Sequence, residues 1–578
     1  MSRPSDSDRL TRRPWLENYP ACVPHSLELC DGPAWSVLEH TAKTFPIQCG
    51  CCYYSQRLSW GEMHDAACRT AAALIELGVR PGDRVGLLLP NMPEYPIALN
   101  GIWMAGGIAV ALSPLMVPEE VSDLIKATDC RTIICLDLLA PLVLHGECQP
   151  EHVLFTTLRD RLPGWQRLGY AFAKIRRLGF WPPSDGPNQH SFEDAIGAVT
   201  ADGIAPYCGS SDDPAYILPT GGTTGRPKAV TLSHRNLVAN ASQLYHWAGG
   251  RVGTESMLAV LPFFHSYGLT TCLMTGVSLA ATLIMHHRFI PRTVIQLIRE
   301  HRPTIFPAVP MMLRRINELL RNDASGVSSL TYCVSGGAPL DDETASEFAG
   351  HTGAIVVEGY GLSEASPVTH TGPLDGSNRI GTIGLPLPGT DARIVDAADG
   401  TRSLDYGEVG ELVVKGPQVM LGYWNDPTAT AEILQGGWLH TGDLSVCDED
   451  GFFRIVDRKK DLIITSGLNV YPNDVEESLR ACPGLQDVAV IGVPDEVRGE
   501  LVKAMVVPVP GSEFDYAEFS AWCDRHLAKH KRPRLVELVD GDLPRNFLGK
   551  VIRRELRSST PKQQTDTEQV ETELTIEV

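Results

Sequence analysis

The sequence has 578 residues, too many for a single hydrophobic core, so two or more domains are expected. Its composition, 43% hydrophobic and 21% charged, is typical of globular proteins and excludes a disordered or fibrous chain. The net charge of −20 argues against general nucleic-acid binding, because phosphate backbones favour clustered lysine and arginine.

The cysteines and the first residues indicate the expected compartment. The fifteen cysteines are scattered apart from the cluster Cys49, Cys51 and Cys52, and no paired zinc spacing occurs. Residues 1–16 lack the apolar run of a secretory signal, so a cytoplasmic protein with reduced thiols is expected. Two long uncharged runs further along are interrupted by proline, glycine or histidine, which favours buried core over a membrane span.

Helices and strands alternate from about residue 35 onward. A helix is expected from Trp60 to Leu77, with Gly78 placed to end it, and a strand is expected within 83–90. The next segment predicts a buried helix, a Gly-Gly turn and a buried strand at Ile108–Leu112. Such repeats favour parallel sheets covered by helices, so the expected fold class is α/β.

A basic, aromatic segment at 158–181 interrupts this alternation. Six basic residues accompany a single aspartate there, in a chain that is acidic overall. At helical spacing Trp165, Leu168, Phe172 and Ile175 share one face, which is the pattern of a helix lying in a membrane interface. A surface helix packed on the protein body accounts for the pattern equally well, and both interpretations stay open.

A loop rich in glycine and threonine follows the apolar run 215–218. It reads TGGTTGRPK from Thr220 to Lys228. Its backbone N–H groups, hydroxyls and ammonium group suit a polyphosphate. The spacing does not match the loop of P-loop NTPases, and a flexible turn is the simpler alternative.

Three further motifs carry candidate site residues. His265 lies in the aromatic run LPFFHSYG, where a lone histidine is more often a core residue than a catalytic one. The turn SGGAP at 335–339 has small residues that let backbone approach a flat ring. In EGYGLSE a strand presents Tyr360, Ser363 and Glu364, which can stack on a purine, donate to a phosphate and hold Mg²⁺.

The pattern changes in the last quarter of the chain, where a compact α+β domain of about a hundred residues is expected. An alternating strand is expected at 452–457, before this domain, and the strands and helix of the domain are expected at 488–493, 502–509 and 516–530. From Ser558 onward the sequence is rich in Gln, Thr and Glu, which predicts a disordered acidic tail.

Together with GWLHTGD, DRKKD and a late Gly-Lys pair, these motifs resemble the signatures of the adenylate-forming superfamily. This superfamily comprises acyl-CoA synthetases, adenylation domains of peptide synthetases, and luciferases. The doubled glycine of the first loop is most similar to bacterial medium- and long-chain fatty-acyl-CoA synthetases. The resemblance implies a large N-terminal domain of mixed sheets with a distorted barrel subdomain, and a small mobile α+β domain after a hinge. The implied segments are 1–457, the hinge 458–460, 461–557 and the tail 558–578.

The resemblance also implies roles for individual residues. The nucleotide-binding residues would be Thr220, Gly221, Gly222, Thr223, Thr224, Gly225, Lys228, Gly336, Gly337, Ala338, Gly359, Tyr360, Gly361, Ser363, Asp443 and Arg458. The catalytic residues would be Lys550, Thr220, Glu364 and His265. Glu364 would be the metal ligand, and His265 would line the carboxylate end of the acyl site without acting as a general base. Gly467 would edge the tunnel for CoA, and Lys460 would be the hinge residue.

Two positions depart from the family pattern. Ser363 stands where the family usually has threonine, and this keeps the hydroxyl. Leu548 stands where many relatives have a serine before the Gly-Lys pair. Because Lys550 itself is present, that substitution bears on the detail of the loop rather than on activity.

The expected function is ATP-dependent ligation of a fatty acid to CoA through an acyl-adenylate, with Mg²⁺ as cofactor. Lysine and hydroxyl donors would neutralise charge where the carboxylate and ATP, two anions, meet. Three alternatives stay open: a ligase that loads a carrier protein, a CoA ligase for a non-fatty acid, and an inactive nucleotide-binding regulator. No nucleic-acid partner is expected, any contact with an anionic membrane would be peripheral, and neither chain length nor oligomeric state follows from the sequence.

Overall fold

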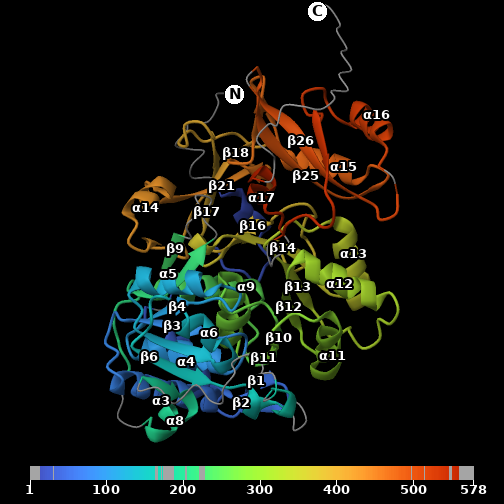
Figure 1. Cartoon of the computed structure of the whole chain (residues 1–578). Coiled ribbons are helices and arrows are strands. Elements are labelled where there is room, and N and C mark those ends of the chain that lie inside the picture. The colour runs from blue at the N-terminus through green and yellow to red at the C-terminus, as the bar shows by residue number, and fades with distance from the viewer. Residues whose placement is uncertain are drawn as a thin grey trace, which may run out of the picture. The chain divides into compact units, whose positions relative to one another are not determined.

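A computed structural model describes residues 13–29, 31–162, 167–170, 172, 188–201, 205–220, 228–495, 497–512, 514–545 and 550–558. The chain forms two compact units, Met1–Ile455 and Val456–Val578. In Figure 1 the first unit runs from blue to orange and the second is coloured orange to red.

An eight-stranded sheet belongs to the first unit, counted over its described residues, in the order β19-β9-β8-β4-β3-β5-β6-β7. The strands from β8 to β7 run parallel, and the β8–β9 hairpin with β19 adds antiparallel pairing at one edge. The strands are β3 Arg84–Leu88, β4 Ile108–Ala111, β5 Thr132–Leu136, β6 His152–Thr156, β7 Gln189–Ser191, β8 Pro214–Thr220, β9 Lys228–Ser233 and β19 Gly422–Tyr423. The associated helices are α3 Trp60–Glu76, α4 Glu94–Met104, α5 Pro118–Thr128, η2 Asp137–Leu139, α6 Ala140–Leu144, η3 Arg159–Arg161, α8 Phe192–Ala198 and α9 His234–Trp247.

A nine-stranded sheet of the same unit, again counted over described residues, has the order β16-β15-β14-β13-β12-β10-β11-β1-β2. Its six central strands, from β14 to β1, run parallel, so their carboxyl ends share one edge. In open α/β sheets that edge is where ligands bind. The strands are β1 Cys49–Tyr53, β2 Gln56–Ser59, β10 Ser256–Ala259, β11 Thr282–Met285, β12 Ile305–Ala308, β13 Tyr332–Ser335, β14 Ile355–Gly361, β15 Val368–Thr371 and β16 Leu385–Pro386. The helices are α2 Trp35–Thr44, η4 Gly268–Met274, α10 Thr275–Ser278, α11 Pro291–His301, α12 Pro310–Leu320, α13 Asp342–Thr352 and η5 Ser363–Ala365.

A third, antiparallel sheet completes the first unit. It consists of β17 Asp391–Val395, β18 Gly410–Lys415, β20 Leu434–Gln435, β21 Trp438–Cys447 and β22 Phe453–Arg458, with α14 Pro427–Ile433 beside it. Strand β22 begins in the first unit and ends in the second. Trp15, on η1 Pro14–Asn18, is only 4% exposed, and its ring centre lies 6.3 Å from that of Phe453. The tryptophan of this N-terminal segment therefore contributes to the core of the first unit.

The second unit is an α+β domain with its own core. Its sheet has the order β24-β23-β26-β25, with β27 paired to β26. The elements are β23 Ile463–Thr465, β24 Leu468–Val470, α15 Pro472–Arg480, β25 Leu485–Asp495, β26 Gly499–Pro508, α16 Tyr516–His526, β27 Leu535–Leu538 and α17 Arg553–Ser558. Val475 and Leu479 of α15 pack against Val490 and Val506 of the sheet. Helix α17 includes Ser558, where the tail was expected to begin, and the tail 559–578 lies outside the described residues.

The α/β fold predicted from the sequence is confirmed. Helix α3 begins at a capping box formed by Ser59 and Glu62, and Gly78 beyond its end has a φ of 89°. A positive φ suits glycine, so the residue that ends the helix was read correctly.

The basic segment at 158–181 is described only in part. Arg161 lies in η3 and forms an ion pair with the buried Glu94 at 2.6 Å, so this arginine does not belong to a membrane-facing surface. Leu168 and Phe172 are exposed, and the other members of the predicted apolar face, Trp165 and Ile175, lie outside the described residues. Among the helices that are described, none combines the length and the hydropathy needed to cross a membrane.

Candidate functional site

The β8–β9 hairpin holds the two ends of the glycine-rich loop. Thr220 ends β8, Lys228 begins β9, and the two residues are paired across the hairpin. The Thr220 hydroxyl donates a hydrogen bond of 3.2 Å to the Lys228 carbonyl. The residues between them, which include Gly221, Gly222, Thr223, Thr224 and Gly225, lie outside the described residues, so their phosphate contacts stay a prediction.

Lys228 lies beside a tyrosine that also contacts Glu364. The Lys228 Nζ is 4.8 Å from the centre of the Tyr423 ring, where the ring's negative face attracts a cation. Tyr423 is held there because β19 pairs with β9. Its hydroxyl donates to Glu364 Oε1 at 2.8 Å. Burial and the Glu364 carboxylate raise the pKa of Tyr423, so the phenol keeps the proton that it donates.

The Glu364 carboxylate is compatible with a magnesium ion that arrives with ATP. Within the described part of the chain, no group of three or more His, Cys, Asp or Glu side chains gathers to form a metal site. Mg²⁺ commonly takes one or two protein carboxylates and completes its shell with phosphate oxygens and water. A single carboxylate near Lys228, the lysine predicted to contact phosphate, fits that requirement.

Tyr360 and Asp443, predicted to contact adenine and ribose, lie in contact with each other. The Tyr360 hydroxyl, on β14, donates to Asp443 Oδ2 at 2.6 Å, and Asp443 on β21 is 3% exposed. Gly361 follows Tyr360 on β14, and a Cβ there would lie 2.0 Å from the Pro367 carbonyl oxygen, so no larger residue fits. The position of the aromatic ring therefore depends on the glycine beside it.

The second glycine-rich turn, 336–338, lies next to this strand because β13 pairs with β14. A Cβ on Gly336 would lie within 3.0 Å of the Tyr267 ring, so the turn packs closely only with glycine at that position. Ser363, predicted to donate to the α-phosphate, has its hydroxyl oxygen 3.2 Å from that of Ser266. These residues lie at the shared carboxyl edge of the parallel strands.

His265 follows β10 at the same edge. Its Nδ1 accepts a hydrogen bond of 3.2 Å from the backbone N–H of Tyr267. Burial lowers the pKa of His265 to about 4, although part of the residue remains accessible. The imidazole is therefore neutral at pH 7, which agrees with a residue that lines a pocket.

Arg458, Lys460, Gly467 and Lys550 belong to the second unit. Gly467 lies in the turn between β23 and β24 with a φ of 78°, and a Cβ there would meet no atom within 4 Å. Lys550 follows 546–549, which lie outside the described residues. A bridge between Arg545 and Val551 closes the base of this loop.

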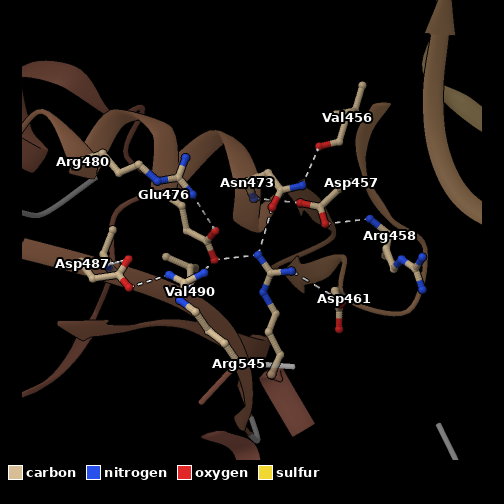
Figure 2. Close-up of polar contacts among 12 residues, drawn as sticks. Val456, Asp457, Arg458, Asp461, Asn473, Glu476, Arg480, Asp487, Val490 and Arg545 are labelled. Carbon is tan, nitrogen blue, oxygen red and sulfur yellow. Dashed lines mark hydrogen bonds and ion pairs between the residues drawn. The ribbon is translucent and has the colours of Figure 1, made fainter. Parts of the chain in front are cut away.

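Buried and half-buried polar residues connect the segment around Lys460 to the segment after Lys550. We define the anchor cluster as Asp457, Asp461, Asn473, Glu476 and Arg553; Figure 2 shows the first four gathered at the start of α15. Arg553 donates to Glu476 Oε1 at 2.6 Å and to Asn473 Oδ1 at 3.0 Å, and it lies 3.7 Å from Asp461. Asp457 accepts from the backbone N–H of Asn473 at 2.8 Å and of Arg458 at 2.7 Å, and burial raises the pKa of Asp457 to about 6.

Sequence reasoning did not find Tyr423, Ser266 or Arg553. Tyr423 contacts Glu364, which is far from it in the chain. The short segment GYW around Tyr423 carries no motif that indicates this contact. Ser266 follows a histidine that had been singled out, so proximity was the available signal. Arg553 lies three positions after Lys550, and its charge in a short helix resembles ordinary surface charge.

Comparison with known proteins decides the family. The family model described as AMP-binding enzyme matches residues 38–424, and its C-terminal domain model matches 474–550. This chain belongs to the AMP-binding enzyme family. A long-chain-fatty-acid–CoA ligase from Bacillus subtilis (strain 168) is 38% identical over 553 residues, which cover 94% of this chain and 98% of the relative. A long-chain-fatty-acid–CoA ligase from Salmonella typhimurium is 36% identical over 558 residues, with coverage of 94% and 98%.

A solved structure supports the architecture. ATP-bound MatB from Rhodopseudomonas palustris has a TM-score of 0.79 and 29% sequence identity, and the match covers 91% of this chain and 98% of that one. The large domain with parallel sheets and the small α+β domain described above are therefore those of an AMP-binding enzyme.

Proposed function

We propose that this chain is an AMP-forming fatty-acid–CoA ligase. In the first step a carboxylate oxygen attacks the α-phosphorus of ATP, the bond to the β-phosphate bridging oxygen breaks, and pyrophosphate leaves. In the second step the CoA sulfur attacks the acyl carbon and the bond from that carbon to the AMP oxygen breaks. AMP leaves, and the acyl-CoA thioester is the other product. The family and the long-chain ligases among its relatives support this reaction, and the contact between Lys228, Tyr423 and Glu364 is the observation in the structure that favours it most.

The first step requires charge neutralisation, because two anions must meet. Lys228 would act on the phosphates, with the hydroxyls of Thr220 and Ser363 as further donors. Mg²⁺ at Glu364 would supply additional positive charge when bound. The adenine would lie against Tyr360, and the ribose hydroxyls would donate to Asp443.

The second unit would supply different groups to the two steps. Lys550 would act during adenylation, and the turn at Gly467 would border the path of the CoA thiol. A rotation about the hinge 458–460, centred on Lys460, would exchange them, with 1–457 and 461–557 as the two domains. Arg458 would donate to the ribose in this arrangement.

Two half-reactions test the assignment. Lys550→Ala should lower acyl-AMP formation by a factor on the order of 10² to 10³, because the charge is needed only while two anions meet. Thioester formation from supplied acyl-AMP and CoA should stay near the wild-type rate. Lys529, an exposed lysine of the same unit, provides the matched control as Lys529→Ala. Equal losses in both half-reactions would contradict separate roles for the two faces.

A panel of carboxylic acids distinguishes the alternatives. AMP release that depends on both a long acyl chain and CoA supports the proposal. Preference for an aromatic or short acid would favour a non-fatty substrate, and thioester transfer to a phosphopantetheine carrier without CoA would favour a carrier-loading ligase. ATP binding without AMP release from any acid would favour an inactive regulator.

A further inference from the structure

A bulge in β1 places two cysteines on the same face of the strand. The pairing of β1 with β2 shifts between Cys49 and Cys51, so Gly50 is the extra residue. A Cβ on Gly50 would lie 2.9 Å from the Trp60 ring, which restricts that position to glycine. The Sγ atoms of Cys49 and Cys52, three positions apart, consequently lie 3.6 Å from each other.

The two thiols differ in exposure and acidity. Cys52 is 5% exposed, whereas Cys49 is only half-buried. The hydrogen bond from Cys52 lowers the pKa of Cys49 to about 7; Arg57 acts in the same direction, while burial and Glu62 oppose it. The same hydrogen bond, together with burial, raises the pKa of Cys52. At neutral pH Cys49 is therefore more often an accessible thiolate than an ordinary cysteine is, and Cys52 stays a protonated thiol behind it.

We infer that Cys49 and Cys52 form a peroxide-reactive thiol pair that closes to a disulfide. The Cys49 thiolate attacks one oxygen of hydrogen peroxide, the O–O bond breaks, and hydroxide leaves and takes up a proton. Cys49 is then a sulfenic acid. The Cys52 sulfur attacks the Cys49 sulfur, the S–O bond breaks, and the oxygen leaves as water with the Cys52 proton. The pair loses two electrons and hydrogen peroxide gains them.

The geometry suits the second step. A disulfide needs the two sulfurs about 2 Å apart, so side-chain rotation must close roughly 1.5 Å from the present separation. A resolving thiol already in contact captures the sulfenic acid before a second peroxide converts it to sulfinic acid. The pair lies on β1 and includes none of the residues proposed for ligation, so the inference does not rest on the proposed function.

The experiment uses the full chain treated with limiting hydrogen peroxide, followed by alkylation of remaining thiols and peptide mass spectrometry. Cys22 and Cys208 are exposed and serve as internal controls in the same sample. We expect a loss of two mass units across the peptide containing Cys49 and Cys52 before either control cysteine is oxidised. Oxidation of Cys22 or Cys208 first, at equal peroxide, would overturn the inference.

Two variants separate the chemical roles of Cys52. Cys52→Ser keeps a donor for Cys49 but cannot form a disulfide, so sulfenic acid at Cys49 should accumulate and be trapped by dimedone. Cys52→Ala removes the donor as well, so alkylation of Cys49 at pH 7 should slow roughly fivefold, because the loss of thiolate fraction outweighs the higher nucleophilicity of a less acidic thiol. Sulfenic acid that persists at Cys49 while Cys52 is intact, or equal alkylation rates in both variants, would refute the pairing.

Discussion

Replacing Glu358 by glutamine should stabilise the first unit at neutral pH. Glu358 lies on β14, where the Leu340 N–H donates to its Oε2 at 3.1 Å. Burial raises the pKa of this carboxyl from 4.5 to about 7, and Asp342 adds to the effect against the Leu340 hydrogen bond. Glutamine keeps an oxygen acceptor for Leu340 and carries no charge to desolvate.

The direction in which the free energy of unfolding changes with pH follows from proton binding. Between pH 4.5 and about 7 the folded chain holds a proton on Glu358 that the unfolded chain has released, so the free energy of unfolding falls as pH rises through this window. A full shift of this size corresponds to about 3 kcal/mol, and because the residue is partly exposed we expect about 2 kcal/mol. Glu358→Gln should therefore resemble wild type near pH 5 and exceed it in stability at pH 8.

Urea unfolding at several pH values, followed by tryptophan fluorescence, measures this difference. Trp522 is the one tryptophan of the second unit, so the signal comes mainly from the first. Glu343→Gln, at an exposed position on α13, controls for the change in net charge. Identical pH profiles for wild type and Glu358→Gln would refute the reasoning.

Three further predictions concern the second unit and the basic segment. Gly467→Leu should spare adenylation and lower CoA turnover, whereas Gly484→Leu, with a similar φ of 80° and equally open space, should affect neither; matching losses in both would point to backbone strain alone. Arg553→Met should destabilise the second unit by about 3–5 kcal/mol, because it leaves Glu476 and Asp461 as buried charges without this partner. Hydrogen exchange over 456–558 measures this loss, the exposed neighbour Arg554→Met is the control, and unchanged exchange would show that Arg553 is dispensable. If the basic segment binds anionic vesicles, each cation contributes about 1 kcal/mol, so changing Arg167, Lys174, Arg176 and Arg177 to serine should reduce co-sedimentation; no binding by the wild type would favour a helix packed on the protein.

Local sequence patterns predicted helices and strands, but they did not predict contacts between residues that are far apart in the chain. Helix α3 was predictable because its cap and its terminal glycine both lie within a few residues of its ends. Strand β8, Pro214–Thr220, contains the apolar run 215–218, which is a local pattern typical of a buried strand. The ion pair of Arg161 with Glu94 spans 67 positions, so this arginine was counted with a surface stripe when its partner is buried in α4.

The candidate site likewise contains residues that local motifs predict and residues that depend on long-range contacts. Motifs named Tyr360, Asp443 and Glu364, because each type of side chain has a chemical use near a nucleotide. They did not name Tyr423, because its role depends on β19 pairing with β9 and not on its neighbours in sequence. A residue that positions another residue is harder to recognise from the sequence than a residue that contacts a ligand.

The anchor cluster constrains how a hinge at Lys460 could work. Asp457 and Asp461 lie on either side of the hinge 458–460, and both are fixed within the second unit: Asp457 by the backbone N–H of Asn473, and Asp461 by Arg557 at 3.1 Å and by Arg553. Rotation at Lys460 can keep the Asp461 contacts, because Asp461 lies on the same side as α17. It would break the Asp457–Asn473 hydrogen bond, because Asp457 precedes the hinge in the chain and Asn473 follows it. Burial raises the pKa of Asp457 to about 6, so the carboxylate in this hydrogen bond is partly desolvated. Breaking the hydrogen bond returns the carboxylate to water, and this hydration offsets part of the free energy lost with the bond. If Lys460 is the hinge, Asp457 is therefore the contact that opens between the two steps, and Arg553 keeps the Lys550 segment attached to α15 throughout.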